Sequence, residues 1–83
     1  MSAVLTLYGR PECHLCELAR DEILALRGAG FEFELREVDI EGDERLLRAY
    51  LERIPVVVVD GEVVSELALD RDALRTRLDT VGT

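Results

Sequence analysis

The spacing of apolar residues changes along residues 4–40, and this change restricts the fold more than any other feature of the chain. Residues 4–8 form a short, mostly apolar run of the kind found in strands that are buried on both faces. Residues 13–27 then follow a helical pattern, and residues 31–36 alternate strictly between apolar and polar side chains. A strand, a helix and a second strand in this order predict a parallel pair joined by a right-handed crossover.

The predicted helix over residues 13–27 has one apolar face, and glycine is expected to end it at the Gly28-Ala29-Gly30 segment. The alternation that follows shifts its parity between Leu35 and Val38. This shift indicates either a bulge or a strand whose pairing begins only near Glu34. The residues expected on the buried face of the helix are Leu15, Leu18, Ala19, Ile23 and Leu26.

The second half of the chain predicts another helix, a hairpin and a last helix. Asp43 is a good N-cap for the first of these, and Pro55 is expected to stop it, because a residue before proline avoids helical geometry. Residues 56–59 are all valine and predict a central strand, and Asp60-Gly61 before a further valine run is a strong hairpin signal. The last helix is expected over residues 70–80. The buried stripe of the middle helix would comprise Leu47, Tyr50, Leu51 and Ile54.

Together these elements predict an α/β domain of the order βαβαββα, with a four-stranded mixed sheet flanked by helices. The 83 residues are expected to form a single domain, 1–83. The chain has 18 acidic against 10 basic side chains, a formal net charge of −8, which argues against binding to nucleic acid or an anionic membrane. The charge fits solubility, or steering toward a basic partner.

No targeting or membrane-spanning segment is visible in the sequence, so a cytoplasmic location is expected. Cytoplasmic thiols are kept reduced, and a lone cysteine pair there is more often catalytic or metal-binding than structural. The chain contains one such pair, Cys13 and Cys16, at the predicted junction of the first strand and first helix.

Cys13 is expected to cap the first helix, with the backbone N–H groups of Leu15 and Cys16 pointing toward its sulfur. The helix dipole adds to this stabilisation of a thiolate, and cysteines in such places have pKa values lowered from about 8.5 to roughly 3.5–7.5. Cys16 lies one turn further along, near the apolar face. Cys13 is therefore predicted to attack a disulfide, and Cys16 to resolve the mixed disulfide that results.

Two charged neighbours bear on this chemistry. His14 either supports the thiolate as an imidazolium or is a solvated surface residue, since a histidine near its ordinary pKa is mostly neutral at pH 7. Arg10 is always charged, and it either steers an anionic substrate group or is an ordinary surface arginine.

Two other functions remain open from the residues alone. One is a metal or iron–sulfur module that uses Cys13, although structural zinc takes four protein ligands and the chain has only two cysteines and one histidine. The other is a non-catalytic adaptor that binds a partner near Pro55. No cofactor and no bound metal are expected for the leading hypothesis, a dithiol–disulfide oxidoreductase.

The stretches YGRPECHLC at 8–16 and RIPVVVVDGEVV at 53–64, in this order and spacing, resemble the glutaredoxin-like branch of the thioredoxin superfamily. With the helices between and after them, the resemblance covers nearly the whole chain. It implies that the Ile54–Pro55 peptide is cis, with the Ile54 backbone against Cys13, where it can pair with a substrate chain. Tyr8 precedes the active loop and either packs beside it or belongs to the core.

The resemblance also implies partners for the protein, and the chain departs from the usual glutaredoxin sequence at two places. The substrate is expected to be a protein or low-molecular-weight disulfide, with glutathione or thioredoxin reductase as electron donor, and the protein is expected to be a monomer. Glutaredoxins commonly have Pro-Tyr where this chain has His14-Leu15, and Gly-Gly where it has Ser65-Glu66. A carboxylate at Glu66 would repel those of glutathione, so a protein dithiol or thioredoxin reductase is an alternative donor.

Overall fold

The structure, a computed structural model, describes the backbone of residues 3–81 and the side chains of residues 3–79. The element order is the predicted one, with one additional short 3-10 helix, η1, after the second strand. The elements are β1 (Ala3–Gly9), α1 (His14–Gly28), β2 (Phe33–Asp39), η1 (Ile40–Gly42), α2 (Glu44–Tyr50), β3 (Val56–Val59), β4 (Glu62–Ser65) and α3 (Arg71–Val81).

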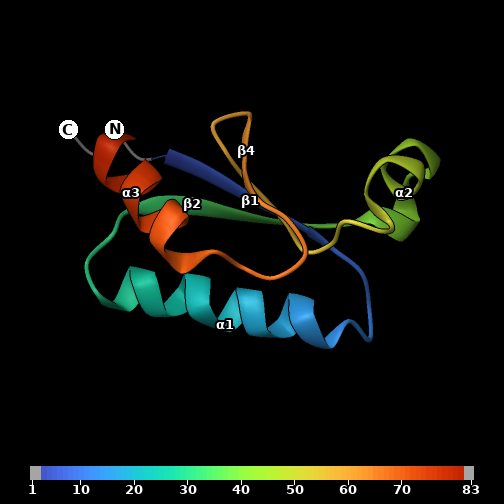
Figure 1. Cartoon of the computed structure of the whole chain (residues 1–83), viewed down its shortest axis with the longest axis horizontal. Helices are drawn as coiled ribbons and strands as arrows, with labels where there is room; N and C mark the ends of the chain where they lie inside the picture. The colour runs from blue at the N-terminus through green and yellow to red at the C-terminus, as the bar shows by residue number, and fades with distance from the viewer. Residues whose placement is uncertain (1–2, 82–83) are drawn as a thin grey trace.

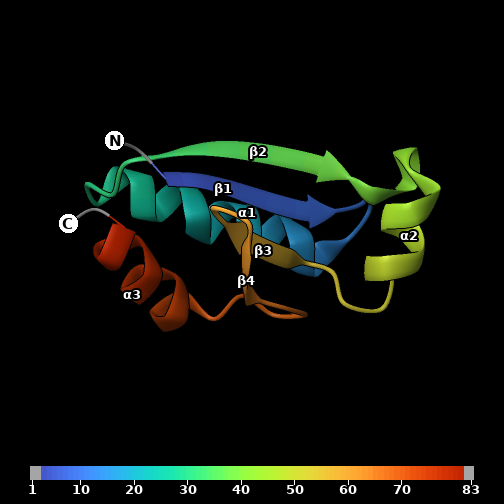
Figure 2. The same cartoon turned by 90° about the horizontal axis from the view of Figure 1, so that it is seen from above.

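The strands form one mixed sheet in the order β2–β1–β3–β4 (Figure 1, Figure 2). β1 and β2 run parallel, as the strand–helix–strand pattern predicts, and β3 runs antiparallel to both β1 and β4. The predicted α/β fold with a four-stranded mixed sheet flanked by helices is therefore confirmed.

Helices α1 and α3 cover one face of the sheet, and α2 lies at the end of the molecule where β1 stops (Figure 1, Figure 2). Two separate groups of buried side chains result. The larger cluster joins α1 and α3 to the sheet and consists of Ala3, Leu5, Leu7, Ala19, Ile23, Leu26, Phe33, Val57, Val59, Leu74 and Leu78. The smaller cluster lies toward α2 and consists of Cys16, Ile40, Ile54, Val56 and Val58.

The predicted hairpin between β3 and β4 is confirmed at Asp60-Gly61, where both residues have positive φ values of 49° and 85°. Such values suit a tight two-residue turn, whose twist matches that of the strands. The Asp60 side chain adds a bond to the neighbouring strand, because its Oδ1 accepts from the Val4 N–H at 2.9 Å.

The parity shift around Leu35 does not come from a bulge. β2 pairs with β1 in an unbroken register from Phe33 to Asp39, and Ile40 then enters the smaller cluster from η1. The pairing begins at Phe33, beside the predicted start near Glu34. A bulge is present instead between β3 and β4, where the register shifts between Val57 and Val58.

Three leucines predicted to be buried are exposed. On α1, Leu15 is 49% and Leu18 46% exposed, because the buried stripe starts one position later, at Cys16. Leu51 is 44% exposed, because α2 ends at Tyr50, well before Pro55. None of the helices within residues 3–81 is long and apolar enough to cross a membrane.

Candidate functional site

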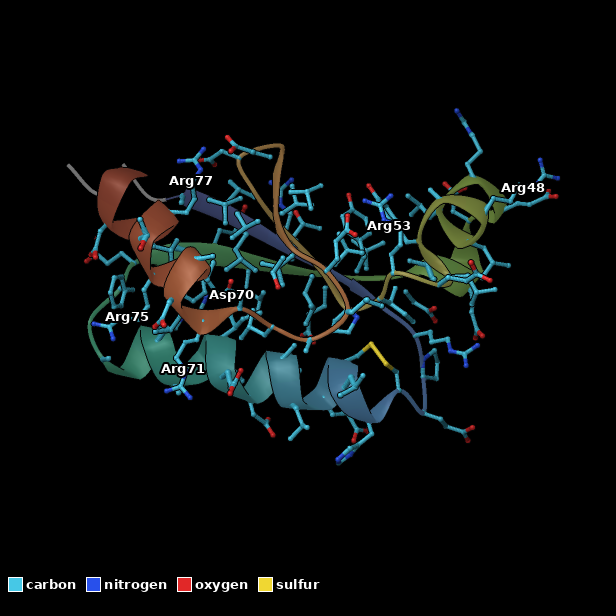
Figure 3. All side chains as sticks on the ribbon, in the orientation of Figure 1. Arg48, Arg53, Asp70, Arg71, Arg75 and Arg77 are labelled. Atoms are coloured by element: carbon cyan, nitrogen blue, oxygen red, sulfur yellow. A yellow bond between two sulfur atoms is a disulfide. The ribbon has the colours of Figure 1, made fainter. Side chains whose placement is uncertain are left out.

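A disulfide between Cys13 and Cys16 lies at the start of α1, on the side of the molecule nearer α2 (Figure 3). The Cα atoms of the two cysteines are 5.2 Å apart, within the range that disulfides require. Cys13 has extended backbone angles, φ −99° and ψ 104°, and stands just outside the regular helix. Cys13 is thus the N-cap of α1, as expected, and this position outside the regular helix lets the two cysteines come close enough to pair.

The cap hydrogen bond involves sulfur rather than oxygen. The Cys16 N–H donates to Cys13 Sγ at 3.2 Å, and the Glu17 N–H donates to the Cys13 carbonyl at 3.1 Å. One of the two N–H groups expected to face the sulfur, that of Cys16, therefore does so.

The two sulfurs differ in their surroundings. Cys13 is half-buried, whereas Cys16 is only 8% exposed and belongs to the smaller cluster. Gly9, the last residue of β1, packs directly behind Cys16: a Cβ atom placed on Gly9 would lie 3.0 Å from Cys16 Sγ and 3.2 Å from its Cβ. Nothing in the sequence singles out Gly9, because only the folded contact shows that a side chain has no room there.

The Ile54–Pro55 peptide bond is cis, as the resemblance implies. Pro55 is fully buried. Ile54 and Cys16 belong to the smaller cluster, and Cys13 packs against that cluster. The cis bond thus lies in the segment that brings α2 back to the sheet beside the disulfide.

The other predicted site residues surround this centre in different ways. Tyr8 is half-buried, and its ring centroid lies 4.9 Å from that of Tyr50, so it packs at the rim of the smaller cluster. Arg10 is exposed, with its Nη1 3.9 Å from Glu41 Oε2. His14 is the exposed first residue of α1.

An ion pair that the sequence pattern does not predict links the cis-proline segment to the loop before α3. The Arg53 guanidinium bonds to the Glu66 carboxylate and lies 5.3 Å from the Tyr50 ring centroid. The Leu67 N–H also donates to the Arg53 carbonyl at 2.8 Å. The hydrogen bond from Arg53 lowers the pKa of Glu66 below its ordinary value and raises the pKa of Arg53. The charge at Glu66 is therefore paired, which the sequence alone did not reveal.

Within the described part of the chain, no group of three or more His, Cys, Asp or Glu side chains is arranged to hold a metal ion.

Comparisons with known proteins agree with this geometry. A family model described as a glutaredoxin-like domain (DUF836) matches residues 4–79. The structure also resembles that of protein Ne2328 from Nitrosomonas europaea, with a TM-score of 0.81 and 32% identity over 93% of this chain and 92% of that one. No curated protein matches the chain.

Two further solved structures extend the comparison. A structural-genomics target protein from X. campestris gives a TM-score of 0.72 and 38% identity, over 92% of this chain and 96% of that one. A mutant thioredoxin from Halobacterium salinarum gives a TM-score of 0.66 and 25% identity, over 95% of this chain and 74% of that one.

Proposed function

This chain belongs to the glutaredoxin-like domain family of the thioredoxin superfamily, and from that premise we propose that it is a dithiol–disulfide oxidoreductase. Cys13 is the attacking residue and Cys16 the resolving one. The substrate is a protein disulfide or a low-molecular-weight disulfide, and no bound cofactor takes part.

The proposed reaction moves two electrons from the protein to the substrate. In the reduced protein, the Cys13 thiolate attacks one substrate sulfur, breaks the substrate S–S bond and releases the other half as a thiolate, which takes a proton from water. The Cys16 thiolate then attacks the Cys13 sulfur and releases the second half as a thiol. The protein ends as the Cys13–Cys16 disulfide. A protein dithiol, thioredoxin reductase or two molecules of glutathione then reduce it again.

The asymmetry of the two sulfurs is the observation that most supports this assignment. Cys13 is half-buried at a helix N-terminus and accepts a backbone hydrogen bond, which suits a nucleophile that meets substrate from outside. Cys16 is buried against Gly9, so it meets only a sulfur that Cys13 has already brought in.

The remaining predicted residues receive supporting roles in the proposal. The Ile54 backbone beside cis-Pro55 pairs with the substrate chain, and Tyr8 forms part of the wall. Arg10 and His14 adjust the charge around Cys13. We also propose that the protein acts in the cytoplasm as a monomer.

A redox titration followed by mass analysis tests the proposal. The protein is equilibrated across thiol/disulfide ratios, free thiols are blocked, and the blocks are counted by intact mass. We expect a single two-electron transition within the range of the cytosolic pool, in which both cysteines change together. Thiols that never pair, or that react only after unfolding, would contradict the oxidoreductase.

Two serine variants form the matched pair for the mechanism. Cys13→Ser is expected to abolish turnover, whereas Cys16→Ser is expected to accumulate a mixed disulfide with substrate on Cys13. Full activity in Cys13→Ser would show that the roles are wrongly assigned. Equal partner binding by the wild type and the double serine variant, without turnover, would favour the adaptor instead.

A further inference from the structure

Cys16, but not Cys13, is among the residues that line a cavity of about 360 Å³. Its walls come from the end of β1, the first turns of α1 and the end of β2, so it approaches the disulfide from the β2 side. Leu7, Pro11 and Val38 supply apolar surface, and the polar part consists of charged side chains. Such a mixed lining is typical of sites for small molecules or for one arm of a larger one.

The two arginines that line this cavity already have acidic partners. Arg20 Nε lies 2.8 Å from Glu37 Oε1, and Arg10 Nη1 lies 3.9 Å from Glu41 Oε2. Each guanidinium therefore lies beside a carboxylate that offsets part of its charge.

Two carboxylates in the same lining have no cationic partner among the side chains that the structure describes. Glu17 directly follows Cys16 and is exposed. Asp39 ends β2, and its Oδ1 accepts only a backbone bond, from the Glu41 N–H at 2.9 Å. The cavity therefore presents uncompensated negative charge next to the disulfide.

The positive end of the α1 dipole does not reverse this balance. The N–H of Cys16 at that end is already directed at Cys13 Sγ, at 3.2 Å. A thiolate formed on Cys13 would use this donor itself and would add to the local negative charge. The lining carries three carboxylates, Glu17, Glu37 and Asp39, against the two guanidinium groups of Arg10 and Arg20. A cationic group entering the cavity is therefore favoured over a carboxylate.

We infer that the preferred substrate disulfide carries a positive charge close to its sulfurs, and that the cavity beside Cys16 receives this ammonium- or guanidinium-bearing arm. The inference rests on the proposed oxidoreductase function and specifies its substrate class. The chemistry remains the exchange described above: one substrate disulfide becomes two thiols while the protein dithiol becomes a disulfide. Electrostatic focusing of this kind raises association rates by about tenfold or more.

Three small disulfides of similar length and different charge provide the test. Cystamine carries two ammonium groups, bis(2-hydroxyethyl) disulfide is neutral, and 3,3′-dithiodipropionate carries two carboxylates. The rate at which reduced protein is oxidised by each is divided by the rate for dithiothreitol with the same disulfide, which removes differences in intrinsic reactivity. We expect cystamine to exceed dithiodipropionate by about tenfold at low salt, with the ratio falling as salt screens the charges.

Two double variants with equal change in net charge separate the cavity from the overall charge. Glu17→Gln/Asp39→Asn neutralises the cavity and retains an oxygen at residue 39 for the cap. Glu32→Gln/Asp79→Asn changes two exposed acidic residues in segments at the other end of the molecule, as Figure 1 and Figure 2 show. We expect the first double variant to lose most of the preference for cystamine over the neutral disulfide, and the second to retain it.

The outcomes distinguish this inference from the function on which it rests. Equal normalised rates for the three disulfides, with normal cycling of the cysteines, would overturn the inference and leave the oxidoreductase standing. A similar loss of preference in both double variants would assign the effect to net charge and overturn the role of the cavity. Failure to react with any of the three disulfides would overturn both proposals.

Discussion

The two buried clusters of this protein differ in composition and in what surrounds them. The larger cluster is purely apolar and is enclosed by α1, α3 and the sheet. The smaller cluster includes Cys16, and Tyr8, Tyr50 and Cys13 pack at its edge. Nothing in α2, the helix beside it, is fully buried. The two clusters therefore differ in how completely they are enclosed.

Because of this difference, we expect the larger cluster to determine stability and the smaller cluster to determine the chemistry of the cysteines. Apolar burial is the dominant favourable contribution to folding, so the larger cluster should supply most of the stability. The smaller cluster holds one sulfur firmly while leaving the other half-buried. Changes in the larger cluster should lower the free energy of unfolding without altering the cysteines, whereas changes in the smaller one should alter the reduction potential.

The largest expected effect is on stability, from Ile23→Ala in the larger cluster. Ile23 is fully buried, and its truncation removes apolar contacts and leaves a cavity, which should lower the free energy of unfolding by about 2–5 kcal/mol. Urea unfolding followed by circular dichroism measures the loss. Leu18→Ala on the same helix is the matched control and should change stability by less than about 0.5 kcal/mol, since Leu18 is exposed.

The reduction potential of Ile23→Ala tests whether the larger and smaller clusters act independently. Ile23 belongs to the larger cluster and Cys16 to the smaller, so the potential of the cysteine pair should stay at the wild-type value. A large shift in potential together with the stability loss would mean that the two clusters act as one unit.

Gly9→Ala should change both the free energy of unfolding and the reduction potential. The new methyl group would lie 3.0 Å from Cys16 Sγ and 3.2 Å from its Cβ, so overpacking should cost about 1–3 kcal/mol. A thiol can rotate away, whereas a sulfur held in the disulfide cannot, so the oxidised form should be destabilised more than the reduced form. The reduction potential should therefore rise, by about 30 mV for each 1.4 kcal/mol of difference.

Gly28→Ala is the control for the glycine substitution. A Cβ atom there meets nothing within 4 Å, and Gly28 is the last residue of α1. Alanine should stabilise the helix slightly, by about 0.5–1 kcal/mol, without moving the potential. A fall in potential for Gly9→Ala would contradict the claim that Gly9 makes room for the oxidised Cys16.

A smaller effect is expected from the aromatic pair at the edge of the smaller cluster. The rings of Tyr8 and Tyr50 lie 4.9 Å apart at 34°. A double-mutant cycle with Tyr8→Leu and Tyr50→Leu should give a coupling energy of about 0.5–1.5 kcal/mol in urea unfolding. Strictly additive losses would show that the rings contribute only by separate burial.

The sequence predicts the element order well because apolar spacing is a local property. Residues 13–27 and Asp60-Gly61 lead to the correct helix and hairpin without any knowledge of distant contacts. Spacing alone does not distinguish two adjacent stripes on α1, so the prediction that Leu15 and Leu18 are buried is wrong. The choice is made by the sheet, because it packs against Ala19 and Ile23.

In the candidate site, too, some features follow from the local sequence, whereas others depend on contacts between distant segments. The capping role of Cys13 follows from its position before a helix, and the cis state of Pro55 follows from the resemblance. The contact between Gly9 and Cys16 and the pair between Arg53 and Glu66 join segments that the sequence does not place side by side. Only the register of the sheet and the path of the loop before α3 bring them together.

The smallest expected effect comes from Glu66→Gln, which breaks the ion pair with Arg53. Pairing lowers the pKa of Glu66 in the folded protein, so it stabilises the fold above the ordinary glutamate pKa of about 4.3. This contribution is lost as the pH falls through the folded value and the carboxylate becomes protonated. The pair is partly exposed, so its contribution should be slight and screened by salt.

Thermal midpoints at pH 7, 5 and 3 measure this contribution. The wild type should lie slightly above Glu66→Gln at pH 7, and the difference should shrink as the pH falls and the wild-type carboxylate takes up its proton. Glu32→Gln, which changes an exposed carboxylate elsewhere, should show no such convergence. A difference that persists at pH 3 would mean that Glu66 holds the cis-proline segment by its shape rather than by its charge.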